Sequence, residues 1–191
     1  LVIVGLNQCG CALLPEALRV CHYANYDDQM PSDKRIRTVI TIIDKELDDK
    51  INLFRYQLPY IEKQIDDIKI DYRNDDFCSE PSLSDIETWN ADPQQMLTIA
   101  VCLSNTDLSL QLGLNLPPSI YQGDTQILIR QEIQTDLGEL ICLDNVRYRN
   151  VKTFGMLEQG ISKPMLQDNM ASFVNQEYCE NGYLLNLYRM Y

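Results

Sequence analysis

The chain opens with the stretch LVIVGLNQCG, residues 1–10, in which four apolar residues run directly into a glycine and a second glycine follows five positions later. A continuous apolar run of this kind predicts a parallel strand that is covered on both faces of its sheet. A glycine at its end permits a sharp turn into a following helix. The stretch therefore has two interpretations: the first strand and phosphate-binding turn of a nucleotide-binding fold, or a buried strand that ends in an ordinary turn.

Segments of strand and helix character alternate along the rest of the chain. Apolar and β-branched runs predict further strands at residues 38–43, 68–72, 97–103, 126–130 and 151–154. Helical spacing of apolar residues predicts helices over residues 11–23, 45–67 and 105–115, with shorter ones near 84–89 and 136–142. The alternation predicts an α/β protein with a Rossmann-like, doubly wound, mostly parallel sheet and helices on both of its faces.

Prolines and polar segments indicate where the expected helices and strands begin and end. Pro15 is expected in or near the first turn of the first helix, where proline is tolerated. The polar stretch 24–37 is expected to be a loop, and Pro117 and Pro118 are expected to stop the helix that precedes them. These features define the order of the elements through residue 130.

Two regions are expected along the chain. Residues 1–157 are predicted to form the nucleotide-binding domain, and residues 158–191 a C-terminal helical extension or a linker to a further domain. The sequence starts inside an apparent strand and without a methionine, so we expect it to be an excerpt from a longer chain. In the extension, the recurring tyrosines are expected to pack against another part of the protein or against a partner: Tyr178, Tyr183, Tyr188 and Tyr191.

The composition of the chain indicates which classes of molecule it is not expected to bind and where in the cell it is expected to be. The formal net charge is -12 and the pI is about 4.4, which disfavours nucleic acid and anionic membrane surfaces as general partners. The cysteine count is seven, an odd number, and several lie in apolar runs, which is typical of reduced cysteines in a cytoplasmic protein. We therefore expect a cytoplasmic location, or the cytoplasmic part of a membrane-associated protein.

The opening turn carries a modified nucleotide-binding motif. Residues 5–10 read Gly5-Leu6-Asn7-Gln8-Cys9-Gly10, which has the first and last glycines of G-x-G-x-x-G at the expected spacing and asparagine in the middle. These six residues are candidate cofactor-binding positions. Asparagine tolerates left-handed backbone angles better than most residues, so the change weakens the motif without excluding it.

An acid at the end of the second strand is the next expected element. Asp44 directly follows the strand 38–43, where a carboxylate accepts hydrogen bonds from a ribose. It lies 34 positions after Gly10, whereas about 20 is typical, and the loop 24–37 accounts for the difference. A vestigial or empty site on the same fold remains an alternative.

Three stretches resemble a known family. LVIVGLNQCG, TIIDKE (41–46) and above all LTIAVCLSNTDLSLQLGL (97–114) are similar to the N-terminal nucleotide-binding domain of Trk-type, or RCK-type, potassium-uptake regulators. In that family a small polar residue ends the fourth strand and a Thr/Asn/Asp-rich turn follows, as Ser104 and Asn105 do here. The tail ASFVNQEYCENG (171–182) resembles the helix that leads into bacterial ryanodine-receptor-type repeat domains.

The resemblance implies a ligand and a role. The ligand would be NAD(H) or an adenine nucleotide, and the role would be regulatory sensing in a homodimer, with a channel or transporter on the same or a partner chain. Gly5, Asn7 and Gly10 would face the phosphates and Asp44 the ribose, while Ser104 and Asn105 would lie at the mouth of the site. Asn7 and the long loop before the second strand depart from the family pattern.

Two other functions stay open, and neither catalytic nor metal-binding residues are expected. One is a nicotinamide-dependent oxidoreductase, which would need a proton donor such as a Tyr–Lys pair or a histidine; His22, the one histidine, is poorly placed. The other is a structural assembly module with an empty site. Cys9, Cys11, Cys21 and His22 match no common zinc spacing. Asp75 and Asp76 are interpreted as a solvated acidic pair.

Overall fold

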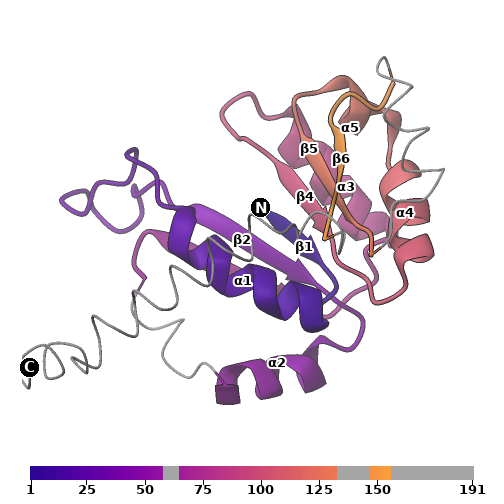
Figure 1. The fold of residues 1–191 in the computed structure, drawn as a ribbon. Coiled ribbons are helices and arrows are strands. Elements are labelled where there is room, and N and C mark those ends of the chain that lie inside the picture. The colour runs from indigo at the N-terminus through magenta and orange to yellow at the C-terminus, as the bar shows by residue number, and fades with distance from the viewer. Residues whose placement is uncertain (58–64, 133–146, 156–191) are drawn as a thin grey trace, which may run out of the picture. The chain divides into compact units, whose positions relative to one another are not determined.

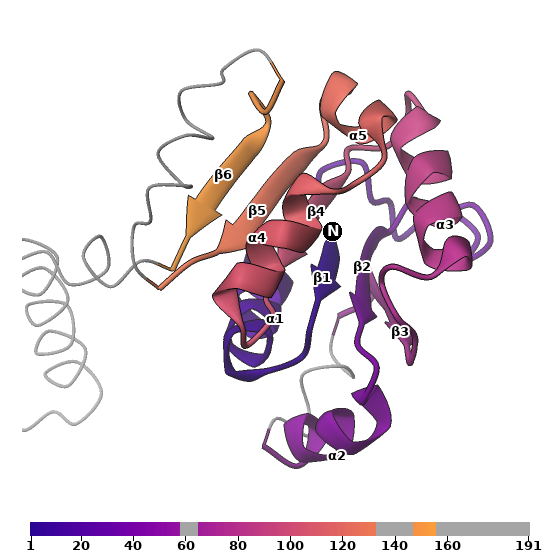
Figure 2. The ribbon, with the colours of Figure 1, turned by 90° about the vertical axis from the view of Figure 1, so that its right-hand side faces the viewer.

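The computed structural model describes residues 1–57, 65–132 and 147–155. Within these ranges the chain forms a six-stranded, all-parallel sheet in the order β3-β2-β1-β4-β5-β6 (Figures 1 and 2). Its strands are β1 (Val2–Val4), β2 (Thr38–Ile43), β3 (Ile68–Arg73), β4 (Thr98–Val101), β5 (Gln126–Arg130) and β6 (Val151–Phe154). The predicted Rossmann-like α/β fold is confirmed.

The first strand lies in the middle of the sheet and reverses the direction of winding. Val2 pairs with Thr41 of β2 on one side and with Ile99 of β4 on the other. The chain therefore moves outward from β1 to β3, returns to pair β4 with β1, and then moves outward again. The carboxyl ends of β1 and β4 form the topological switch point, where ligands bind in open α/β sheets.

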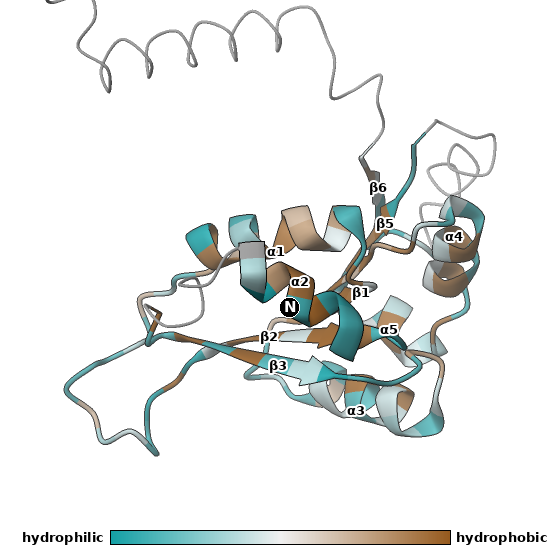
Figure 3. Ribbon diagram, turned by 90° about the horizontal axis from the view of Figure 1, so that it is seen from below, coloured by the Kyte–Doolittle hydropathy of each residue, from teal (hydrophilic) through white to brown (hydrophobic). Residues whose placement is uncertain are grey.

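Helices cover both faces of the sheet (Figure 3). They are α1 (Gln8–Val20), α2 (Leu47–Gln57), α3 (Glu80–Ala91), α4 (Thr106–Leu114) and α5 (Pro118–Gln122). Ile3 of β1 packs in the cluster that contains residues of α1 and α2, whereas Val2 and Val4 pack in the cluster that contains residues of α3, α4 and α5. This alternation is the period of two that a strand imposes, and it makes every side chain of β1 apolar.

The first helix begins earlier than predicted, at Gln8 instead of residue 11. Asn7 caps it, and the helix starts inside the glycine motif. Pro15 therefore lies in the interior of the helix and not near its first turn, so that expectation was wrong. The loop 24–37 contains no helix or strand in this fully described stretch, as expected.

Capping signals account for the other differences. Ser79 accepts a hydrogen bond from Ser82 N and starts α3 at Glu80, so this helix is longer than the predicted 84–89. Pro117 and Pro118 not only follow α4 but start α5, because proline is favoured in a first helical turn. The predicted helix 45–67 begins only at Leu47 and is described as α2 through Gln57, and residues 65–67 are not helical, so the prediction was too long at both ends. The predictions at 136–142 and 158–191 lie outside the described residues.

Candidate functional site

The turn after β1 needs both of its glycines. Gly5 has a φ of +93°, a left-handed conformation that favours glycine. A Cβ on Gly10 would lie 2.1 Å from the carbonyl oxygen of Gly5, so the start of α1 packs directly on the turn. These are the two tasks that the first and last glycines perform in a nucleotide-binding turn.

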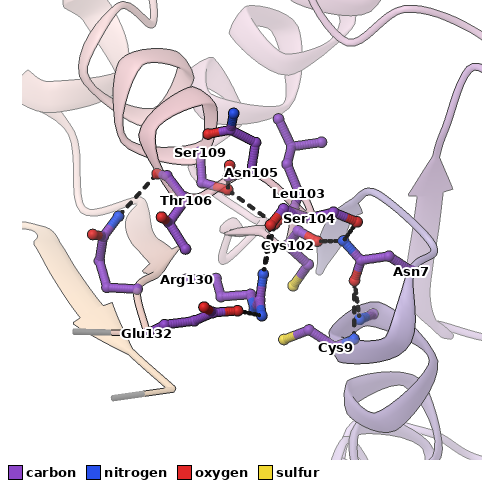
Figure 4. A network of polar contacts seen from close by, with 12 residues as sticks. Asn7, Cys9, Cys102, Leu103, Ser104, Asn105, Thr106, Ser109, Arg130 and Glu132 are labelled. Atoms are coloured by element: carbon purple, nitrogen blue, oxygen red, sulfur yellow. Dashed lines mark hydrogen bonds and ion pairs between the residues drawn. The ribbon is translucent and has the colours of Figure 1, made fainter. Parts of the chain in front are cut away.

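The asparagine in the middle of the motif holds the turn together. Asn7 Oδ1 accepts hydrogen bonds from Cys9 N at 2.9 Å and Gly10 N at 3.3 Å, and thereby caps α1. Its Nδ2 donates to the carbonyl oxygen of Cys102 and to Ser104 Oγ, the latter at 3.2 Å (Figure 4). One side chain therefore joins the turn after β1 to the end of β4 and occupies two amides of the first turn of α1.

The acid at the end of β2 is also engaged within the chain. Asp44 is 8% exposed and accepts hydrogen bonds from Leu6 N at 2.7 Å and Glu46 N at 2.8 Å. Both of its oxygens lie 2.8 Å from Lys50 Nζ. Burial alone would raise the pKa of Asp44, but the hydrogen bonds from Lys50, Glu46 N and Leu6 N outweigh it and lower that pKa below its usual value. Asp44 is thus an ionised anchor for the glycine turn.

A cleft of about 670 Å³ opens at the carboxyl ends of the strands, in front of this turn. Gly5, Asn7, Asp44, Ser104 and Asn105 line it. The structure therefore brings five of the predicted site residues to one cavity at the switch point. Asn105 accepts hydrogen bonds from Asp107 N and Leu108 N and so caps α4 at the cleft.

The other predicted residues of the glycine motif do not line this cleft. The Leu6 side chain is buried with residues of α1 and α2, and Gln8 is exposed. Gly10 is buried behind Gly5, and Cys9 faces Cys102. These four residues shape the turn.

Asp75 and Asp76, which were not expected to belong to a site, line the same cleft. Asp75 accepts hydrogen bonds from Ser79 Oγ at 2.7 Å and Ser82 Oγ at 2.9 Å, and Asp76 lies 2.7 Å from Lys45 Nζ. These contacts lower the pKa of both carboxyl groups. Both residues are part-exposed, so they are open to solvent as expected, and each is in addition held by contacts within the chain. Their position just beyond the carboxyl end of β3 was the signal, since all parallel strands end at the same edge.

The walls of the cleft combine apolar and charged residues that sequence reasoning missed. The apolar part includes Phe77, Leu103, Leu108 and Leu112. Lys45 and Lys50 are the described cations of the lining, and they face Asp76 and Asp44 respectively. The charged residues of the lining therefore follow β2 and β3, whereas the residues from the β4–α4 side are uncharged, with leucines and amides among them.

Other candidate groups lie elsewhere. His22 Nδ1 is 2.7 Å from Asp67 Oδ2, just beyond α1 and just before β3, which is the amino edge of the sheet. A Tyr-x-x-x-Lys spacing, which would suit an oxidoreductase, occurs at Tyr148 and Lys152. Tyr148 precedes β6 and packs edge-on against Tyr121 at a ring distance of 5.3 Å, so it also lies at the amino edge. Neither pair reaches the cleft.

No group of three or more metal-binding side chains comes together among the described residues. No helix in those ranges is long and apolar enough to cross a membrane.

Comparisons with protein-family models, with curated proteins and with solved structures find no match to this chain. The family resemblance drawn from residues 1–10, 41–46 and 97–114 therefore stays a prediction. The fold is therefore assigned from the strand order of the sheet alone, and the candidate site from the contacts described above.

Proposed function

We propose that this domain binds an adenine nucleotide in the cleft at the carboxyl edge of the sheet and acts as a ligand-sensing regulatory domain. The observation that carries the binding proposal is the coincidence of three features at the switch point. These are the two-glycine turn, the acid at the end of β2 and a cavity of about 670 Å³ between them and α4. Open α/β sheets bind nucleotides at this position.

The lining of the cleft suits a nucleoside. Phe77, Leu108 and Leu112 offer an apolar wall against which a flat base can pack. Gln111 and Asn115 of the lining supply amide donors and acceptors for the edge of a base, and Asp75 supplies a carboxylate. A base with both donor and acceptor groups, such as adenine, matches this set.

The hydrogen bonds that Asn7 already accepts in the first turn of α1 favour a mononucleotide over NAD(H) as the ligand. A dinucleotide places its pyrophosphate on the first turn of the helix after β1. Here Asn7 Oδ1 already accepts from Cys9 N and Gly10 N, so a pyrophosphate would have to displace this side chain. Lys45 and Lys50 offer positive charge to a shorter phosphate group on the other side of the cleft.

A thermal-shift screen tests the proposal. Adenosine, AMP, ADP, ATP, NAD and NADH are each added at about 1 mM to the purified chain. A ligand with a Kd of about 0.1 mM that binds only the folded state would stabilise it by roughly 1.4 kcal/mol. We expect the largest rise in Tm with an adenine mononucleotide. A cooperative melt that no nucleotide shifts would contradict the proposal.

Matched leucine variants locate the binding site. Leu108 lines the cleft on α4 and is 51% exposed, whereas Leu53 on α2 is 61% exposed and lies outside the lining. Leu108→Trp fills the cleft and is expected to abolish the nucleotide shift, while Leu53→Trp leaves it unchanged. Equal loss in both variants, or in neither, would place binding elsewhere.

The regulatory role rests on the family resemblance and needs a separate test. We expect a homodimer whose geometry responds to the nucleotide, by a shift in the population of two arrangements. Light scattering gives the mass with and without ligand, and small-angle X-ray scattering gives the change in shape. Oxidation of NADH by the purified chain would instead favour an oxidoreductase.

A structural assembly module is the second candidate, and one observation favours it. Asn7 satisfies two first-turn amides and Asp44 is held by three donors, so these ligand-binding groups are satisfied without a ligand. A chain that assembles identically with and without every nucleotide in the screen would support this candidate.

A further inference from the structure

Two cysteines face each other beneath the glycine turn. Cys9 lies in the first turn of α1 and Cys102 directly follows β4. Figure 4 shows both sulfur atoms directed into the same space between the helix start and the strand end, and the Cys102 thiol is the neighbour with the largest effect on the pKa of Cys9. Both are free thiols in this structure. The pair is separated by most of the domain in sequence, so its proximity is a product of the fold.

The backbones of both cysteines are held by one side chain. Asn7 Oδ1 accepts from Cys9 N at 2.9 Å, and Asn7 Nδ2 donates to the carbonyl oxygen of Cys102. Cys102 N also donates to Val4 O at 2.8 Å. A disulfide forms only where the two backbones are already close, and here the Asn7 side chain bridges the backbones of both cysteines.

The two thiols have unequal environments. Cys9 is half-buried, while Cys102 is fully buried. The hydrogen bond from Cys102, with a smaller contribution from the charge of Arg130, lowers the pKa of Cys9 to about 7. The hydrogen bond to Cys9 and burial raise the pKa of Cys102. Because the thiolate is the reactive form, Cys9 is the group that meets an oxidant first and Cys102 the one that follows.

We propose that Cys9 and Cys102 are a redox pair that a peroxide converts into a disulfide across the switch point of the sheet. The Cys9 thiolate attacks one peroxide oxygen, the O–O bond breaks, Cys9 becomes a sulfenic acid, and the departing hydroxide takes up the proton that the thiol had released and leaves as water. The Cys102 sulfur then attacks the Cys9 sulfur, the S–O bond breaks, and the Cys102 proton leaves with the hydroxyl group as a second water. In total two thiols lose two electrons and two protons, and one hydrogen peroxide is reduced to two waters.

This redox pair is independent of the nucleotide proposal, because it uses side chains that do not line the cleft. Its place is nevertheless next to the ligand-facing turn, since Asn7 contacts both cysteine backbones and lines the cleft. The disulfide would lock the start of α1 to the end of β4. The chemical class of its effector is a peroxide, and a dithiol reverses it.

Mass spectrometry of the full chain tests the proposal. The protein is reduced, freed of reductant, treated with one equivalent of hydrogen peroxide, blocked with N-ethylmaleimide and digested. We expect a peptide in which Cys9 is joined to Cys102, and its disappearance after dithiothreitol. Two results would overturn the proposal: oxidation of Cys9 to the sulfinic acid while Cys102 stays a free thiol, or a disulfide between Cys9 and a different cysteine. The wild-type chain is sufficient for this experiment.

Two variants sharpen the experiment. Cys9→Ser removes the half-buried member of the pair, and a far-UV circular dichroism spectrum like that of the wild type shows that it folds. It is expected to leave Cys102 fully reduced at the same peroxide dose. Cys11→Ser is the matched control, because Cys11 lies two residues further along the same helix and contacts Leu6 O instead. The Cys9–Cys102 peptide is expected at wild-type yield in Cys11→Ser, and its loss there would contradict the assignment.

Discussion

The backbone amide of Leu6 donates a 2.7 Å hydrogen bond to the carboxylate of Asp44, 38 residues further along the chain. The acid at the end of β2 therefore holds the turn at the end of β1, with Lys50 of α2 as its counter-ion. At the position where a ribose-binding acid is expected in this fold, Asp44 is a structural support of the glycine turn. This dual position determines how variants at Asp44 are to be interpreted.

Asp44→Ala is predicted to destabilise the domain as well as to alter ligand binding. It leaves the buried amide of Leu6 without its acceptor and Lys50 without its partner, and an unsatisfied buried group costs about 1–3 kcal/mol. Urea unfolding measures the change in free energy. Asp33→Asn, in the exposed loop 24–37, is the control and is expected to change stability by less than about 0.5 kcal/mol. Equal stability of Asp44→Ala and the wild type would show that these contacts contribute nothing.

The acid side of the stability curve is predicted to depend on Asp44. Its pKa is lowered in the folded state, so its contribution is present above the unfolded pKa of about 3.9 and is lost as the pH falls through the folded value. The stability difference between the wild type and Asp44→Asn should therefore be constant above about pH 5 and shrink below about pH 4. Urea titrations at several pH values measure it. A difference that stays constant down to pH 2.5 would contradict the lowered pKa.

The strands and the position of Asp44 were predictable because they depend on local apolar runs. TVITII forms β2 as predicted, and Asp44 follows it despite the long loop between Gly10 and the strand. A loop insertion changes the distance along the sequence but not the order of strands in the sheet. The strand order therefore predicted the position of Asp44 correctly, although the distance from Gly10 to Asp44 is longer than the motif alone predicts.

The charged side of the cleft and the helix boundaries were not predictable from local pattern. Asp75 and Asp76 look like surface acids in the sequence, and only the common edge of the parallel strands brings them beside Asp44. The early start of α1 depends on Asn7, whose side chain was considered for its backbone angles and not for capping. Contacts that cross from one βα turn to the next leave no periodic signal in a single sequence.

Gly10→Ala is predicted to reverse the usual effect of this substitution in a helix. Alanine normally stabilises a helix by about 1 kcal/mol relative to glycine. Here the new Cβ would lie 2.1 Å from Gly5 O, which is backbone, so the turn must shift and we expect a loss of about 3 kcal/mol. Gly123→Ala is the control, because its Cβ would meet the end of the Asn90 side chain at 2.8 Å, which can move. Thermal melts of both variants measure the difference, and a stabilised Gly10→Ala would contradict the packing described here.

Asn7→Gly is predicted to lower stability and to change ligand preference. The variant loses the cap of α1 and the bonds to Cys102 O and Ser104 Oγ, for which we expect a cost of about 1–2 kcal/mol. Asn105→Gly loses only a comparable cap on α4 and should cost less. If the nucleotide proposal holds, the freed amides of Cys9 and Gly10 should tighten NAD binding by about tenfold, since hydrogen bonds to a charged group are strong. Calorimetric titration with NAD and AMP checks this, and an unchanged preference would show that Asn7 does not control the phosphate position.

The alkylation of Cys9 is predicted to follow its pKa of about 7 and not its exposure. Cys78 is exposed and has a raised pKa because of burial of its sulfur and the nearby charge of Asp76, so access favours Cys78 while thiolate content favours Cys9. With limiting iodoacetamide at pH 7, peptide mapping should find Cys9 modified faster, with a rate that reaches half of its plateau near pH 7. Cys102→Ala removes the hydrogen bond that lowers the pKa and should move this midpoint toward the ordinary value of about 8.5. A midpoint that stays near pH 7 in Cys102→Ala would contradict this explanation. It would show that the low pKa of Cys9 comes from the start of α1 and from Arg130, and not from its contact with the Cys102 thiol.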